Sequence, residues 1–253
     1  MSRRLRIASS AGYSLVELLV ALALSLFLIA GIAVMYFSTS QTYHVQQQTA
    51  QLQEHERLVA TFVGSVVRSA GYYAAPMTNY PDLAFPANTT FAATGQNIYG
   101  TSASSGGDYA DTVAVRFLTA PGDSVLNCLG FGNQGTASDA YQLYVNQFQL
   151  DTADHQLECT VSGPGIATQT QPLLDGVTSF EILYGVDTNG DGSADEYLSG
   201  SAIAAIGWSA VTVRSVKMML KFAAATNPVT GVPEPNAKPI SFQAVFAIRA
   251  TPQ

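Results

Sequence analysis

A run of oxygen-bearing side chains near residue 190 is the strongest candidate for a metal site in this sequence. Four of them fall at positions 1, 3, 5 and 9 of a calcium-loop spacing, namely Asp187, Asn189, Asp191 and Asp195. Gly192 falls at position 6, where such a loop turns sharply. Calcium is a hard cation that takes about six to eight oxygen ligands. The pattern therefore predicts a structural Ca²⁺ site, in which the ion holds the loop in place and has no catalytic role.

The loop departs from the calcium pattern at position 12, which is Leu198 where a bidentate glutamate is usual. Glu196 would have to take that place. The alternative is a hairpin tip in which Asp, Asn and Gly satisfy the geometry of a turn without any ion. Both interpretations stay open at this point.

No arrangement of catalytic residues is visible. Gly130, Gly132 and Gly135 match G-x-G-x-x-G, but no helical pattern follows, and phosphate binding needs a helix N-terminus. The three histidines, His44, His55 and His155, are scattered, and no G-x-S-x-G elbow occurs. We therefore predict a protein that is not an enzyme.

Cys128 and Cys159 are the two cysteines of the chain, and their spacing makes no C-x-x-C pair. In an exported domain the default is one disulfide, whereas in the cytosol they would be two buried thiols. We expect the disulfide if the domain is exported.

Glu17 is the only side chain between Tyr13 and Phe37 that is charged at neutral pH. The run from Leu18 to Phe37 is long enough, at about 1.5 Å per helical residue, to cross the roughly 30 Å hydrocarbon core of a bilayer. Three arginines precede it, at positions 3, 4 and 6, so the positive-inside rule places the N-terminus in the cytoplasm and the rest outside.

Two ordinary explanations of this segment fall short. A secretory signal has a shorter apolar region and a small-x-small cleavage site before a polar sequence. A plain signal anchor accounts for the length and the charges but not for Glu17, because an unpaired carboxylate in lipid is costly. Glu17 therefore needs a partner or a function.

The residues from Gly12 to Leu18, GYSLVEL, resemble the signal of type IV prepilins and type II secretion pseudopilins. The resemblance implies that a prepilin peptidase/N-methyltransferase cuts between Gly12 and Tyr13 and methylates the new N-terminus at Tyr13. Cleavage on the cytoplasmic side leaves the apolar run attached. Glu17 can then neutralise the ammonium of a neighbouring subunit as both enter an apolar filament core. The first mature residue is Tyr13 where the family usually has Phe, and no proline lies between Tyr13 and Tyr73.

The helical pattern continues beyond the apolar run. Val45, Leu52, Val59 and Val66 recur every seven residues. Gly71 is a predicted C-cap, and Pro76 prevents continuation. We predict a leader at 1–12, a helix at 13–75 that is transmembrane at about 15–37 and amphipathic at 38–71, and a head at 76–253. A coiled-coil stem is the alternative for the second half.

The head has the pattern of a β-rich domain. Residues 72–110 predict little regular structure, and strands are predicted at 112–118, 141–150, 157–161, 177–185, 213–222 and 240–250. In the fifth of these, Val216, Met218, Leu220 and Phe222 alternate with more polar positions. Strands after a long helix predict a pilin-like α+β fold, with one sheet wrapped against the helix.

Further phrases resemble the minor pilin PilW family of type IV pilus systems. They are Ser69 to Tyr72, Cys128 to Gly130, Phe180 to Gly192, and the strand that begins at Val213. The resemblance implies a minor pilin-like subunit of the inner membrane that takes part in pilus initiation and in the tip complex. The implied partners are other minor pilins, the major pilin and a large tip adhesin. It also implies a periplasmic head that later lies outside the cell.

Two other functions compete with this one, a minor pseudopilin of type II secretion and a signal-anchored periplasmic binding domain. Nucleic acid is excluded as a partner by charge. The chain carries −7 overall, and without the leader it has eight basic against 18 acidic residues, a net charge of −10. An acidic surface repels phosphate backbones.

Overall fold

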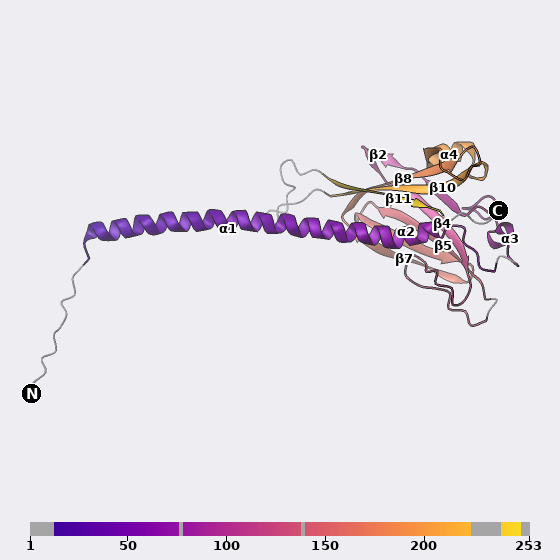
Figure 1. Cartoon of the computed structure of the whole chain (residues 1–253), viewed down its shortest axis with the longest axis horizontal. Coiled ribbons are helices and arrows are strands. Elements are labelled where there is room, and N and C mark those ends of the chain that lie inside the picture. The colour runs from indigo at the N-terminus through magenta and orange to yellow at the C-terminus, as the bar shows by residue number, and fades with distance from the viewer. Residues whose placement is uncertain (1–12, 76–77, 138–139, 224–238, 249–253) are drawn as a thin grey trace, which may run out of the picture. The chain divides into compact units, whose positions relative to one another are not determined.

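The computed structural model describes residues 13–75, 78–137, 140–223 and 239–248. The chain divides into two compact units, Met1–Gln51 and Leu52–Gln253. The described part of the first unit is helical, and every described strand lies in the second (Figure 1). A long apolar helix followed by a β-rich head confirms the predicted α+β class.

The helical region consists of three consecutive elements, α1 (Leu15–Leu58), the π-helical η1 (Val59–Val63) and α2 (Gly64–Arg68). It ends at Arg68, inside the predicted range of 13–75. Gly71 adopts φ +77°, a left-handed conformation that favours glycine, and its N–H donates to the Arg116 carbonyl. The C-cap is Ser69 and not the predicted Gly71, and the chain turns away two residues later, at Gly71.

The head contains two antiparallel sheets where the sequence predicted one. The first sheet has the order β1-β4-β5-β6-β7. Its strands are β1 (Ile98–Thr101), β4 (Thr112–Thr119), β5 (Gln142–Asp151), β6 (Gln156–Gly163) and β7 (Ile166–Asp175). The second sheet has the order β11-β10-β8-β9. Its strands are β8 (Val177–Asp187), β9 (Glu196–Ser199), β10 (Thr212–Phe222) and β11 (Ile240–Ala247).

Short elements complete the head. A two-stranded ribbon pairs β2 (Ser104–Ser105) with β3 (Asp108–Tyr109). The helices are α3 (Pro81–Ala84), α4 (Gly200–Ile206) and the 3-10 turn η2 (Trp208–Ala210). In Figure 1 the ribbon strand β2, α4 and the second sheet lie together on one side of the head.

The core lies where the helix end meets both sheets. The buried residues here are Val59, Val63, Val66 and Val67 of the helix and Ala70 just after it. They share one cluster with Phe148 of β5 and Phe180 of β8. Gly64 lets β11 approach the helix, because a Cβ at Gly64 would lie 2.6 Å from the Phe246 ring. The buried amphipathic face thus packs on the head, as its spacing predicted. Val45 and Leu52 lie outside the residues whose side chains the structure describes.

The alternation predicted for β10 is confirmed. Val216, Met218, Leu220 and Phe222 are buried, and the intervening Lys217, Met219 and Lys221 are half-buried. Strands β4, β5, β6 and β8 match their predictions within two residues at each end. The last predicted strand, 240–250, is described as far as Ala247, and its final two residues lie outside the described part.

Three parts of the prediction were incomplete. The region 72–110, expected to hold little regular structure, contains α3, β1 and the β2–β3 ribbon. Strands β7 and β9 were missed. In β7 the six residues 167–172 are exposed, so this edge strand has no buried alternation for a sequence pattern to reveal.

A disulfide joins Cys128 to Cys159, with the two Cα atoms 6.3 Å apart. This confirms the expected disulfide, and export of the domain stays a prediction. The bridge ties the loop after β4 to the centre of β6, and both cysteines are buried in the core.

We expect the double substitution Cys128→Ala and Cys159→Ala to lower the free energy of unfolding by about 3–4 kcal/mol. The reason is that the bridge closes a loop of 31 residues in the unfolded chain. The measurement is equilibrium unfolding in urea of the full chain in detergent. Equal urea midpoints for the oxidised protein and the double variant would contradict the prediction.

Candidate functional sites

The N-terminal helix carries the predicted assembly residue. Glu17 lies in the first turn of α1 and is exposed, and Ser14 precedes the helix and accepts a hydrogen bond from the Val16 N–H at 3.4 Å. In the described part of the chain Glu17 forms no ion pair. Tyr13 is 82% exposed, and Gly12 lies outside the described residues.

The same helix satisfies the physical requirements of a membrane span. Within Leu15–Ser40, an 18-residue window has a mean hydropathy of 2.8, and none of that window is buried. A helix of 26 residues rises about 39 Å at about 1.5 Å per residue, more than a hydrocarbon core requires. Cleavage at Gly12 and methylation of Tyr13 stay predictions.

The aspartate loop is the connection between β8 and β9. Asp187 is the last residue of β8, and Val186 pairs with Glu196 across the hairpin. The Asp187 carboxylate accepts hydrogen bonds from the N–H groups of Gly190 at 2.6 Å and Gly192 at 2.9 Å. The turn predicted by the alternative interpretation is therefore present.

The other three predicted ligands are brought together at the tip of this loop. Asn189 Nδ2 donates to Asp191 at 3.3 Å and to Asp195 at 3.2 Å. Asp195 also accepts from the N–H and the hydroxyl of Thr188, each at 2.8 Å. These oxygens are therefore held by the loop's own donors.

Arg214 on β10 supplies a positive charge beside the first ligand position. Its Nε donates to Asp187 Oδ2 at 3.0 Å, and the Asp187 side chain is 1% exposed. No three His, Cys, Asp or Glu side chains within the described residues converge to hold a metal ion. The all-oxygen donor set suits Ca²⁺, but an ion bound to Asp187 would have to compete with Arg214.

These contacts lower the pKa of two carboxyls. Burial by itself would raise the pKa of Asp187, but the hydrogen bonds from Gly190, Arg214 and Gly192 outweigh it and leave the pKa below its usual value. Hydrogen bonds from Thr188 lower the pKa of Asp195. Both carboxylates are thus stabilised in their charged form by the folded loop.

Acid is therefore expected to weaken the head through this loop. A carboxyl whose pKa is lower in the folded chain than in the unfolded chain stabilises the fold. This contribution is fully present above the pKa of the unfolded chain, about 3.9, and it is lost as pH falls through the pKa of the folded chain. We expect the melting temperature of the wild type to fall more steeply below about pH 4 than that of the Asp187→Asn variant. The measurement is thermal unfolding at a series of pH values.

The comparison with Asp187→Asn separates the effect of Asp187 on the pH dependence of stability from the opposite effects of other carboxyls. Burial raises the pKa of Asp111 and of Glu181, so these carboxyls change stability in the opposite direction as pH falls. They are present in both proteins. Parallel curves for the wild type and the variant would show that Asp187 makes no such contribution.

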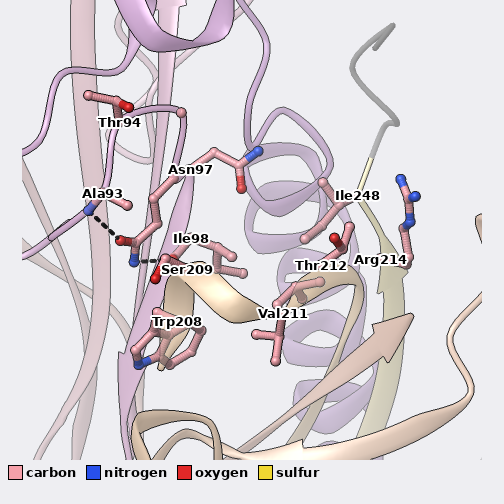
Figure 2. Close-up of a pocket in the computed structure, with 13 residues that line it drawn as sticks. Ala93, Thr94, Asn97, Ile98, Trp208, Ser209, Val211, Thr212, Arg214 and Ile248 are labelled. Atoms are coloured by element: carbon pink, nitrogen blue, oxygen red, sulfur yellow. Dashed lines mark hydrogen bonds between the residues drawn. The ribbon is translucent and has the colours of Figure 1, made fainter. Parts of the chain in front are cut away.

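A pocket of about 260 Å³ opens between the two sheets, and the sequence did not predict it (Figure 2). Its lining comes from 93–98, from 208–214 and from Ile248. No local motif connects segments so far apart in the chain. The Gly130–Gly135 motif, in contrast, lies in a segment without helix, which agrees with its interpretation as a loop.

The chain has an apolar helix followed by a β-rich head, the arrangement that the sequence predicted for a pilin-like fold. Residues 133–245 match the model of a family described as Type IV Pilus-assembly protein W, or PilW. This match lies within the second unit and confirms the resemblance to the PilW family. It supports a minor pilin-like role in type IV pilus assembly.

Among solved structures, a type IV-like pilin from Thermus thermophilus is similar to this chain at 14% sequence identity and a TM-score of 0.42. The similarity covers 78% of this chain and 95% of that one. No curated protein matches this chain at a significant level.

Proposed function

We propose that this chain is a minor pilin-like structural subunit that is processed at the inner membrane and takes part in initiating type IV pili and in their tip complex. The observation that carries the proposal is the PilW match over 133–245 in a chain whose N-terminal helix has membrane-spanning length and composition. Its role is structural and not catalytic.

The proposed processing follows from the position of the signal. Cleavage between Gly12 and Tyr13 removes three arginines and leaves the whole apolar helix attached. The product keeps its anchor, with the N-terminus cytoplasmic and the head periplasmic. A new ammonium appears on Tyr13, which the peptidase then methylates.

Glu17 is proposed to receive that ammonium from a neighbouring subunit. It has no ion pair in the described chain, and it lies at the start of the apolar stretch Leu15–Ser40. Two opposite charges that enter an apolar filament core together avoid the cost that each would bear alone. The proposed neighbours are other minor pilins, the major pilin and a large tip adhesin.

Mass spectrometry of the N-terminus tests the proposal on protein purified from its native host. We expect the mature chain to begin at Tyr13 with one added methyl group. A chain that keeps Met1 would favour a signal-anchored periplasmic binding domain. A cut beyond residue 30 would overturn any account that needs the apolar helix.

A processed N-terminus is also expected of a type II secretion minor pseudopilin. Deletion of the gene distinguishes these two functions, because the mutant is examined for both surface pili and protein secretion. Loss of surface pili with normal protein secretion supports the pilus subunit, whereas loss of secretion with normal pili supports the pseudopilin.

We also propose that the β8–β9 loop binds Ca²⁺ through Asp187, Asn189, Asp191 and Asp195. The oxygen donors support this, and displacement of Arg214 from Asp187 is the expected cost. Bound calcium would hold the loop in place.

Calcium is expected to raise the melting temperature of the full chain, and a chelator is expected to reverse the rise. The shift should disappear in Asp191→Ala, which removes one of the proposed ligands. Asp191 is chosen because it is exposed, so its loss should disturb the fold less than loss of the buried Asp187. The shift should grow in Arg214→Gln, which removes the competing charge. A melting temperature that calcium and chelator leave unchanged would end this part of the proposal.

A further inference from the structure

The pocket between the sheets has the shape and chemistry of a small-ligand site. Asn97 and Ile98 stand on the segment that enters β1, Trp208 and Ser209 lie on η2, Thr212 begins β10, and Ile248 follows β11 (Figure 2). Its volume of about 260 Å³ lies just below the range of about 300–1,000 Å³ that is usual for drug-sized ligands. A ligand of monosaccharide size suits this volume.

The pocket presents no unpaired charge. Arg214 is the only ionisable residue that lines it, and its guanidinium is paired with Asp187 at 3.0 Å. A charged ligand would gain no counter-charge there and would lose its hydration. The ligand that fits is therefore neutral.

The lining is rich in side chains whose hydrogen-bonding capacity the described chain does not use. The four are Thr94, Asn97, Ser209 and Thr212, three hydroxyls and one amide, and none makes a side-chain hydrogen bond within the described residues. The Gln96 side chain, by contrast, forms hydrogen bonds from both ends of its amide. Its amide accepts from the Ala93 N–H at 3.3 Å and donates to the Ile98 carbonyl at 3.0 Å. One wall is thus held in place while the free polar groups remain available.

An aromatic ring and aliphatic groups complete the lining. Trp208 is half-buried, and its ring is held edge-on by Tyr184, with centroids 5.0 Å apart, and by Tyr99 at 5.3 Å. Ile98, Val211 and Ile248 add apolar surface. A sugar ring has the matching character, with apolar C–H faces that stack on aromatic side chains and a rim of hydroxyls that both donate and accept.

We propose that this pocket binds a neutral pyranose, as a free monosaccharide or as one residue of a surface or cell-wall glycan. Trp208 offers its face to the ring, and the amide of Asn97 and the hydroxyls of Ser209 and Thr212 bind the rim. The proposal is independent of filament assembly, because it concerns only residues of the second unit.

Trp208 provides a direct readout because it is the only tryptophan in the chain. The experiment titrates the full chain with methyl glycosides of glucose, galactose, mannose and N-acetylglucosamine while tryptophan fluorescence is recorded. The detergent must have no sugar headgroup. We expect at least one glycoside to change the fluorescence saturably, with a dissociation constant on the order of 1–10 mM.

Two exposed hydroxyls give variants that should fold normally. Thr212→Val and Ser209→Ala are each expected to weaken binding about fivefold, because each removes a hydrogen bond to the ligand and no bond within the protein. Ser124→Ala is the matched control. Ser124 is also exposed but lies outside this pocket, so its variant should bind like the wild type.

Ligand-observed saturation-transfer NMR with Trp208→Phe provides a second measurement that does not depend on fluorescence. The phenyl ring keeps an apolar face, so binding should persist at reduced affinity. The proposal is overturned if none of the glycosides binds, or if binding is equal in Thr212→Val, Ser209→Ala and Ser124→Ala. Cell-wall fragments and cell-surface oligosaccharides, tested next, would separate the two sources of the sugar.

Discussion

Replacement of Glu17 by alanine is expected to reduce surface filaments at least about tenfold while the head stays folded. In the proposed filament the Tyr13 ammonium of one subunit loses its partner when Glu17 of the next is removed. Breaking a buried ion pair by removing one partner costs about 3–5 kcal/mol. Because about 1.4 kcal/mol is a factor of ten in an equilibrium, entry of such a subunit would become more than a hundredfold less favourable.

Glu54→Ala is the matched control for this experiment. Glu54 is also a glutamate of α1, but it lies beyond the apolar stretch, 63% of its side chain is exposed, and its ion pair with Arg57 is a surface pair. Such pairs contribute about 0–1 kcal/mol, so filament numbers should remain normal.

Filaments are counted by electron microscopy and by immunoblotting of sheared surface fractions. The melting temperature of each purified variant checks that the head is intact. Normal filament numbers in Glu17→Ala, with Tyr13 still processed, would show that the carboxylate has no role in assembly.

Replacement of Arg116 by methionine is expected to destabilise the head by at least about 3 kcal/mol. Arg116 lies on β4, is completely buried, and has no carboxylate partner among its hydrogen bonds. Burial lowers the pKa of its guanidinium to about 10, so the side chain remains charged at neutral pH.

The guanidinium is satisfied by backbone carbonyls of the loop between α3 and β1. It donates to Gln96 at 2.5 Å, to Pro86 at 2.6 Å and to Phe85 at 3.1 Å. The Phe91 ring lies 4.3 Å from the guanidinium carbon, a cation–π distance. One side chain therefore anchors an irregular loop to the first sheet.

Methionine fills similar space but removes the Arg116 donor from the carbonyls of Gln96 and Pro86, at about 1–3 kcal/mol for each group that stays buried. The Phe85 carbonyl keeps the Gly95 N–H as a donor.

Arg116→Lys should recover only part of the lost stability. The lysine ammonium is a compact group and cannot reach all the carbonyls that the wide, planar guanidinium contacts. Arg57→Met is the control, since Arg57 has an exposed side chain, and it should change stability by less than about 1 kcal/mol.

Equilibrium unfolding in urea measures these differences for the full chain in detergent. The loss should also appear as increased proteolysis within 86–97, the loop that Arg116 holds. Arg116→Met with the stability of the wild type would show that the loop finds other donors and that the buried arginine is dispensable.

The sequence revealed several features of the head because they depend on local patterns. The alternation of Val216, Met218 and Leu220 identified β10, and Gly71 placed the end of the helix to within three residues of Arg68. Cys128 and Cys159 identified the disulfide once export was assumed. The first two signals each involve only a few neighbouring residues. The third depends on cysteine, a residue type that in exported proteins usually pairs with another cysteine.

The aspartate loop was recognised as a hairpin tip and as a candidate calcium site, and both interpretations used the same residues. The structure adds the contact between Arg214 and Asp187, which joins residues 27 positions apart. No spacing rule predicts that contact, because it arises from the pairing of β8 with β10.

The sequence by itself determined the class of this protein. An apolar run with one carboxylate at its start, preceded by arginines, indicates a membrane-anchored subunit, and the GYSLVEL motif adds the prediction that it is processed. A membrane-spanning helix can be predicted from its own residues, because the lipid contacts that helix directly and no distant part of the chain is involved.

Only the tertiary structure decided how the head is divided and where it can bind. The separation into two sheets, the exposed edge strand β7, the burial of Arg116 and the pocket beside Trp208 all depend on contacts between distant segments. The physical reason is that burial and hydrogen-bond satisfaction belong to the packed chain as a whole. A residue such as Arg116 has the same local pattern whether it faces water or a ring of carbonyls.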